Sequence, residues 1–170
     1  MCDLSFTYRH EDGTEESLYL GPHLCGPDVD PKKRLYHFKP MPAIATTDDR
    51  FYFLGWPITA EELAKFGKRW RKKGIPSRDP FYLGCTYLKA ASGFMHLQTV
   101  LVEPQTEREK MDPENKDGLG FVMLWVNEAE RFHRIPTQGQ VDRLVEILKR
   151  EPEWYRDLYE SEDFDMHNLP

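Results

Sequence analysis

Long apolar runs and paired cysteines are both missing from this chain of 170 residues. No segment approaches the roughly 20 apolar residues that a helix needs to cross a bilayer, and no run of signal-peptide length follows Met1. Three cysteines, Cys2, Cys25 and Cys85, are odd in number and too widely spaced to form a C-x-x-C pair or a disulfide framework. These absences predict an intracellular protein, in the cytoplasm or nucleus, and disfavour a membrane partner.

Motifs that mark several large enzyme families are missing as well. The sequence contains neither phosphate-binding pattern, G-x-x-x-x-G-K-[ST] or G-x-G-x-x-G, and neither G-x-S-x-G nor H-E-x-x-H. His23 and Cys25 stand near Asp28 and Asp30, but no second Cys/His pair completes a zinc site. We therefore expect no metal and no cofactor.

Apolar side chains are present in sufficient number for one compact core. Hydrophobic residues make up 39% of the chain and aromatic residues 13%, which argues against wholesale disorder. We expect a single domain whose α+β core spans residues 50–150. Residues 1–49 would add strands and loops to the same domain, and residues 151–170 would form an acidic, aromatic C-terminal tail.

Runs of β-branched and aromatic residues predict the strands. The expected strands are 4–9, 16–20, 34–38, 50–56, 79–88, 93–103 and 121–127. "KAASG" would join the fifth and sixth of these as a hairpin. "FVMLWV" is apolar at six consecutive positions, which indicates a strand covered on both faces. The segment 104–120 has few apolar residues and predicts a long exposed loop.

Two amphipathic helices are expected. Thr59 and Glu62 have the spacing of a capping box, and Gly74 stands where a helix would end, so the pattern predicts a helix over 60–73. A second helix is expected within 137–150, where apolar residues recur at helical spacing. The segment 153–164 would add a short helical turn.

The predicted architecture is an α+β fold, a mainly antiparallel sheet with the two amphipathic helices packed on it. The order helix, three strands, helix over 59–150 resembles that of a double-stranded-RNA-binding domain, which would imply RNA as a partner. In that family the second helix begins with a lysine-rich stretch that meets phosphate. Here "TQGQVDRL" offers only Arg143.

The segment "AKFGKRWRKKG" at 64–74 has six positive charges in eleven positions. At about 100° per residue, Leu63, Phe66 and Trp70 fall on one arc of the helix, and the cations occupy much of the remaining circumference. A cationic helix face of this kind can be exposed to solvent without a binding role, can bind the phosphates of a nucleic acid, or can dock on a partner protein. The candidate binding residues are Lys65, Lys68, Arg69, Arg71, Lys72, Lys73 and Arg78.

Acidic residues are concentrated at the C-terminus. Residues 151–170 contain seven acidic side chains and one arginine, which gives −6, the formal net charge of the whole chain. We hypothesise that this tail lies across the basic helix and competes with anionic ligands. Because exposed ion pairs contribute only about 0–1 kcal/mol each, such a tail would be held loosely and would respond to salt.

The candidate catalytic residues are Cys85 and His96, on the two arms of the expected hairpin. A thiolate beside an imidazole is a common nucleophile pair. A two-residue turn at 92–93 would place both side chains on one sheet face, whereas a five-residue loop at 89–93 would place them on opposite faces. A cysteine between apolar neighbours in a strand is more often an inert core residue.

Three functions are consistent with these features. The first is a non-catalytic binding or adaptor protein that uses the basic helix and the acidic tail to bind a partner protein or a second copy of itself. The second is a nucleic-acid-binding module. The third is a small-molecule enzyme with His96 or His133 in a pocket lined by aromatic residues. The aromatic candidates for that pocket are Tyr52, Trp56, Tyr82, Tyr87 and Trp125.

Overall fold

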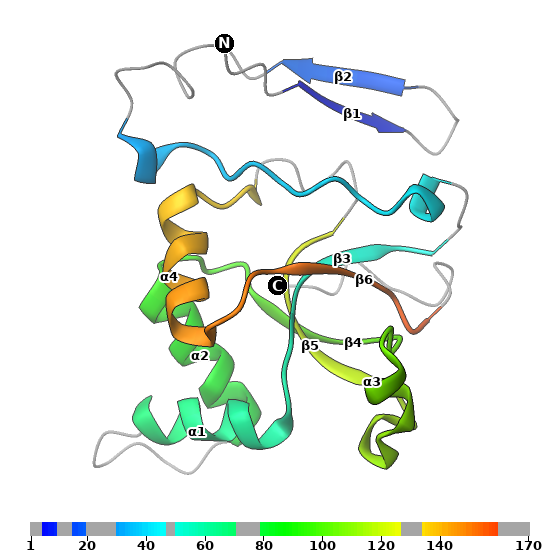
Figure 1. The fold of residues 1–170 in the computed structure, drawn as a ribbon. Coiled ribbons are helices and arrows are strands. Elements are labelled where there is room, and N and C mark those ends of the chain that lie inside the picture. The colour runs from blue at the N-terminus through cyan, green and yellow to red at the C-terminus, as the bar shows by residue number, and fades with distance from the viewer. Residues whose placement is uncertain are drawn as a thin grey trace.

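The computed structural model describes residues 5–9, 15–19, 30–46, 50–70, 79–126 and 134–159. Its strands are β1 (Ser5–Arg9), β2 (Glu15–Tyr19), β3 (Tyr52–Pro57), β4 (Gln98–Val102), β5 (Leu119–Val126) and β6 (Glu153–Arg156). Its α-helices are α1 (Ala60–Trp70), α2 (Pro80–Ser92), α3 (Glu107–Met111) and α4 (Gln138–Leu148). Short 3-10 helices are η2 (Pro31–Lys33), η3 (Ala43–Thr46) and η4 (Pro113–Asn115). Figure 1 shows their arrangement.

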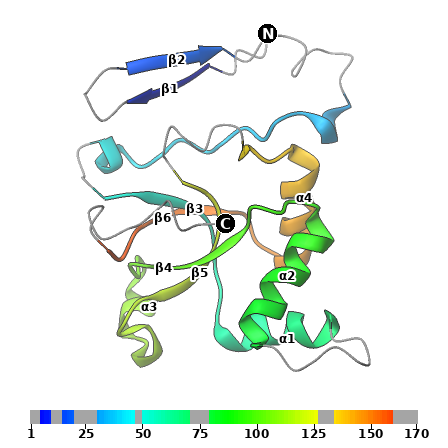
Figure 2. The same cartoon turned by 180° about the vertical axis from the view of Figure 1, so that it is seen from behind.

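A four-stranded antiparallel sheet with the order β4-β5-β3-β6 forms the centre of the molecule. β1 and β2, which lie at two of the segments expected to be strands, form a separate antiparallel pair. Figures 1 and 2 show α1, α2 and α4 gathered at one side of the sheet and α3 at the other. The predicted α+β fold with a mainly antiparallel sheet is thus confirmed.

β5 separates two hydrophobic clusters, because its side chains alternate between the faces of the sheet. Val122 and Leu124 pack with residues of α1, α2 and α4. Phe121 and Met123 pack on the opposite face with Phe53 and other residues of the sheet. All four of these β5 side chains are buried, which confirms the prediction of a strand covered on both faces.

The two outer strands of the sheet meet at one end. Val102 at the end of β4 forms an antiparallel bridge with Asp157, directly after β6. Next to it, the Glu103 N–H donates to the Arg156 carbonyl at 2.9 Å, and the Glu103 carboxylate is paired with Arg50. The sheet is therefore curled, and the hydrophobic cluster that contains Phe53, Phe121 and Met123 lies on its concave side.

The sequence prediction was wrong for residues 79–88, which form most of helix α2 and not a strand. The Asp79 side chain caps the helix by accepting from the Phe81 N–H at 3.0 Å. Pro80 occupies the first turn, and Gly93 ends the helix at φ 76°. "KAASG" is therefore a helix C-terminus, and no hairpin joins this segment to β4. Helix capping outweighed the β-rich composition here.

Three further segments differ from the prediction. Residues 104–120 include α3 and η4, where a loop was expected. Residues 153–156 form strand β6, where a helical turn was expected, so part of the predicted tail belongs to the sheet. Residues 34–38 form no strand and contribute one bridge, from Leu35 to Thr137.

The order of elements also differs from that of a double-stranded-RNA-binding domain. From residue 52 the order is β3, α1, α2, β4, α3, β5, α4, β6, so two helices follow one another where that family would require a strand. The predicted resemblance therefore gives no support for RNA as the partner.

Candidate functional site

Helix α1 is built as the sequence predicted. The Thr59 side chain accepts from the Glu62 N–H at 3.2 Å, and the Glu62 carboxylate accepts from the Thr59 N–H at 3.1 Å, which completes the capping box. Leu63 is buried, and the Phe66 ring stacks on Tyr87 of α2 with centroids 5.8 Å apart. The apolar side of α1 therefore packs against α2 and is not available to a ligand.

The cations of α1 lie on the exposed side of the helix. Lys65 pairs with Glu61 at 3.0 Å, one turn away, and both side chains are exposed. Lys68 and Arg69 are also exposed, and neither makes an ion pair with any described residue. The Arg69 guanidinium lies 5.8 Å from the centroid of the Phe66 ring, which orients it without neutralising its charge.

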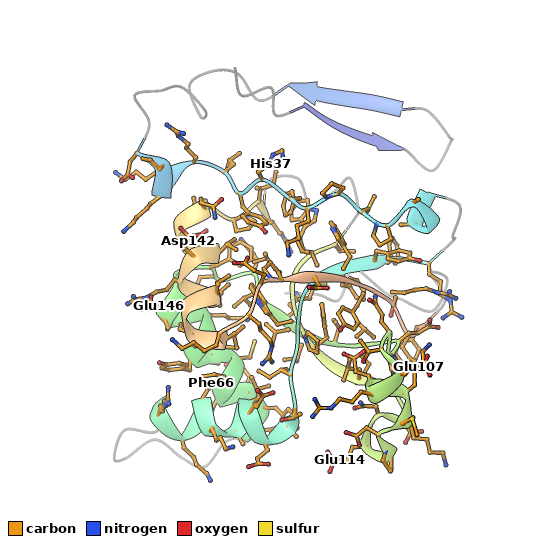
Figure 3. The ribbon with its side chains drawn as sticks, in the orientation of Figure 1. His37, Phe66, Glu107, Glu114, Asp142 and Glu146 are labelled. Carbon is orange, nitrogen blue, oxygen red and sulfur yellow. The ribbon has the colours of Figure 1, made fainter. Side chains whose placement is uncertain are left out.

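We call Lys65, Lys68 and Arg69 the cationic face of α1. Figure 3 labels Phe66 on this helix, which lies beside α2. The other four predicted binding residues lie outside the described part of the chain; they are Arg71, Lys72, Lys73 and Arg78. The structure thus places three of the seven predicted residues together, on an accessible helix surface.

Cys85 lies on helix α2, partly buried against the core, and its thiol contacts the Leu97 carbonyl oxygen at 3.9 Å. Burial raises the pKa of the thiol, and the charge of Lys89 offsets only part of that increase. A raised pKa lowers the thiolate fraction, which is the reverse of what a nucleophile requires. His96 lies beyond the end of α2, where its ring contacts Phe94 edge-on. Because Cys85 is in a helix, neither of the two hairpin registers considered for Cys85 and His96 occurs in the structure.

Of the five aromatic residues proposed to line an enzyme pocket, Trp125 alone borders the cavity beside His96. Tyr82 is exposed on α2, and Tyr87 stacks on Phe66. Tyr52 and Trp56 are buried in the helix-side core, and the Trp56 indole N–H donates to the Arg150 carbonyl at 2.7 Å. The cavity beside His96 has a volume of about 10 Å³, room for a single water molecule. His133 lies outside the described residues.

A larger, polar groove of about 560 Å³ is also present among the described residues. It lies between the start of α1 and the α3–η4 segment, with Pro57, Ile58 and Leu119 as apolar lining. Its charged and polar lining consists of Thr59, Glu62, Thr106, Arg108, Glu109, Asp112, Glu114, Asn115 and Arg150. Figure 3 labels Glu114 on the α3–η4 side of this region. This groove could not be expected from the sequence as long as residues 104–120 were predicted to be loop.

Arg150 and Glu62 connect the end of α4 to the start of α1. The Arg150 guanidinium donates to Glu62 at 3.3 Å and also to the Pro57 carbonyl oxygen. Burial alone would raise the pKa of Glu62, but hydrogen bonds from Thr59 and Arg150 outweigh it and hold the pKa below its usual value. The wall of the groove that Arg150 and Glu62 form is therefore charged at neutral pH, and its two charges are paired with each other.

Glu109 fixes the opposite wall of the groove to the sheet. One carboxylate oxygen accepts from the Tyr155 hydroxyl at 2.8 Å, and the other accepts from the Gln105 and Thr106 N–H groups, each at 2.9 Å. Burial opposes ionisation, yet these hydrogen bonds lower the pKa of Glu109. The spacing of Thr106 and Glu109 is a capping-box signal that could have predicted α3.

The described residues contain no group of three or more His, Cys, Asp or Glu side chains placed to hold a metal ion. Within those same ranges, no helix has the length and apolar character needed to cross a bilayer. The segment with His23 and Cys25 lies outside them.

Comparison with known proteins gives no match: no family model, no curated protein and no solved structure is significantly similar to the chain.

Proposed function

We propose that the protein is a non-catalytic, intracellular binding or adaptor protein, and that the cationic face of α1 binds an acidic surface of a partner protein. The observation that supports this most strongly is the division of α1 into two sides. Leu63 and Phe66 pack inward, while Lys68 and Arg69 are exposed and make no ion pair with any described residue.

The position of this face favours binding over a purely structural role. A lysine or arginine that stabilises a fold is usually paired or partly covered, as Arg150 is by Glu62 and Pro57. Among the residues that the structure describes, Lys68 and Arg69 make no ion pair with a carboxylate, which supports a role for their charge in binding an external anion. In the sequence, Arg71, Lys72 and Lys73 follow directly and would extend the same charge.

The remaining candidate functions have less support. An enzyme with a pocket at His96 would need more room than about 10 Å³. Nucleic acid remains the second candidate, because the charge density of 64–74 suits phosphate as well as carboxylate. The acidic residues after Tyr159, which are Glu160, Glu162, Asp163 and Asp165, would compete with either ligand.

Fluorescence anisotropy with three labelled probes tests the proposal: a ten-residue oligoglutamate peptide, a single-stranded RNA and a double-stranded RNA. We expect the full chain to bind the oligoglutamate peptide, more weakly as salt rises. Tighter binding of either RNA, with a steep dependence of log K on log salt, would favour the nucleic-acid function. No binding of any probe at low salt would refute a role for the cationic face in recognising anions.

A further inference from the structure

The groove between the start of α1 and the α3–η4 segment has the size of a ligand pocket, and its walls are already fixed. Its volume of about 560 Å³ lies within the roughly 300–1,000 Å³ typical of small-molecule sites. On one wall Arg150 holds Glu62 at 3.3 Å. On the other wall the Tyr155 hydroxyl holds Glu109 at 2.8 Å. A ligand that enters a groove with fixed walls has few side chains to order, which favours binding.

Two of the four carboxylates in the lining of the groove are already used by the fold. Glu62 accepts from Arg150 with one oxygen and from the Thr59 N–H with the other. Both oxygens of Glu109 are occupied as well, one by the Tyr155 hydroxyl and the other by main-chain N–H groups. These two side chains therefore form the walls of the groove and are not its binding groups.

Three acceptors remain in the groove, within four consecutive residues at η4. Asp112 uses one carboxylate oxygen to accept from the Glu114 N–H at 3.0 Å, and no described residue donates to the other oxygen. The Glu114 carboxylate, labelled in Figure 3, makes no ion pair within the described ranges. The Asn115 side-chain amide donates to the Glu109 carbonyl oxygen at 3.0 Å, which leaves its own oxygen as an acceptor. All three side chains line the groove.

The charge of the groove favours a cation. Its lining contains four carboxylates and two guanidinium groups, a formal balance of −2, and one of the guanidinium groups, that of Arg150, is paired with Glu62. An alkylammonium group has three N–H donors and no acceptor, which matches the three remaining acceptors in number. A metal ion is less well served, because the described residues contain no group of three His, Cys, Asp or Glu side chains placed to hold one.

We propose that this groove binds an alkylammonium group, the chemistry shared by a lysine side chain and an aliphatic polyamine. The ammonium donates to the free acceptors of Asp112, Glu114 and Asn115. The alkyl chain lies along the apolar lining, as lysine stems do on protein surfaces. That lining consists of Pro57, Ile58 and Leu119.

Binding of a single alkylammonium group is weak, because so small a ligand makes few contacts. We therefore expect a dissociation constant on the order of 1 mM. The groove is separate from the cationic face of α1, since Lys65, Lys68 and Arg69 do not line it. The two proposals therefore stand or fall separately.

Titration of the full chain, followed in proton–nitrogen correlation NMR spectra, tests the proposal. The probes are diaminopentane, Nα-acetyl-lysine methylamide and, at matched ionic strength, ammonium chloride. We expect both organic probes to shift the main-chain amide signals of 106–119, and ammonium chloride to leave them unchanged because it has no alkyl chain. Tighter binding of diaminopentane identifies a polyamine as the ligand, and tighter binding of the lysine derivative identifies a lysine side chain.

Removing the two free carboxylates locates the site. Asp112→Asn/Glu114→Gln keeps an oxygen at position 112 to cap η4 and should weaken binding of the organic probes at least fivefold. The control Glu107→Gln/Glu146→Gln makes the same change in net charge at side chains that are 85% and 64% exposed and lie outside the groove. It should change affinity less than twofold. The same spectra check that each variant is folded.

A second pair of variants tests the sign of the charge effect. Arg108 lines the groove and is exposed, and it makes no ion pair with a described residue, so Arg108→Gln should tighten binding of the organic probes two- to fivefold. Lys110 lies on the same helix outside the groove, and Lys110→Gln should have less than half that effect. The proposal is overturned if neither organic probe shifts the signals of 106–119 at about 20 mM, twenty times the expected dissociation constant. It is also overturned if ammonium chloride shifts them equally, or if variant and control change affinity alike in either pair.

Discussion

Gly84 of α2 lies directly against the backbone of α1: a Cβ atom on Gly84 would stand 2.2 Å from the carbonyl oxygen of Leu63. This contact sets how closely the two helices approach, and the stacking of Phe66 on Tyr87 lies one turn further along both helices. The outward orientation of the cationic face of α1 therefore depends on a glycine in the neighbouring helix.

Replacing Gly84 with alanine should destabilise the protein by about 1–3 kcal/mol, because the helices would have to separate. The sign of the change in unfolding free energy is informative, since a Gly→Ala substitution within an exposed helix normally stabilises a protein by roughly 1 kcal/mol. Urea unfolding followed by far-UV circular dichroism measures the difference. An unchanged or increased midpoint would show that α1 and α2 do not meet at this residue.

Tyr155→Phe should cost about 1–3 kcal/mol, because the hydroxyl donates to the charged Glu109 carboxylate and fixes α3 to β6. A double-mutant cycle with Glu109→Gln isolates the pairwise contribution. Additive effects of the two substitutions would mean that the hydrogen bond contributes nothing.

The pH dependence of this contact follows from the lowered pKa of Glu109. A carboxyl whose folded-state pKa is lowered stabilises the fold above its unfolded value of 4.5, and that contribution is lost as pH falls through the folded-state pKa. Tyr155→Phe removes one cause of the lowering. The variant should therefore lose less stability than the wild type between pH 5 and pH 3.

The contribution of Asp157 to stability should depend on pH in the opposite direction to that of Glu109. It is 1% exposed, one carboxylate oxygen has no hydrogen-bond partner, and burial raises its pKa above the usual 3.8. The folded state then binds the proton more tightly than the unfolded state, so this carboxyl costs stability as pH rises above 3.8.

Asp157→Asn should accordingly be at least as stable as the wild type at pH 7, because the remaining oxygen can still accept from Tyr159. Urea unfolding at pH 4 and pH 7 measures this, with Asp117→Asn at an exposed site as the control. A loss of more than about 2 kcal/mol at pH 7 would mean that the charged form of Asp157 is needed.

Several elements could be predicted from the sequence because a local signal and the packing agree. The capping box at Thr59 and Glu62, the apolar spacing in 137–150 and the apolar run in 121–127 each specify one structure. Helix α2 was mispredicted because its aromatic and β-branched residues favour strands, while the capping signals Asp79 and Gly93 favour a helix.

The remaining features depend on contacts that are distant in sequence. β6 exists because Trp154 and Tyr155 pair with β3, about one hundred residues earlier, which no local pattern reveals. The groove between α1 and α3 requires the Tyr155–Glu109 contact for the same reason. The division of α1 into an apolar side and a side with Lys65, Lys68 and Arg69 was predictable, because it follows from helical periodicity.

Neutralising the acidic residues after Tyr159 tests whether they compete for the cationic face. The variant Glu160→Gln, Glu162→Gln, Asp163→Asn, Asp165→Asn should bind oligoglutamate two- to tenfold more tightly at low salt, with the difference disappearing at high salt. Truncation after residue 150 is not an equivalent test, because it would delete β6. Equal affinities of the variant and the wild type at low salt would contradict competition.

The most direct test of the central claim is the affinity of Lys68→Glu/Arg69→Glu for labelled oligoglutamate, compared with a control reversal of equal charge. The control is Lys110→Glu/Arg143→Glu, which reverses two exposed cations on α3 and α4. Each reversal on the cationic face replaces an attraction with a repulsion, so we expect at least a tenfold loss of affinity. The control should change affinity less than threefold. Equal losses in both variants would show that only net charge matters, and would contradict a binding site on α1.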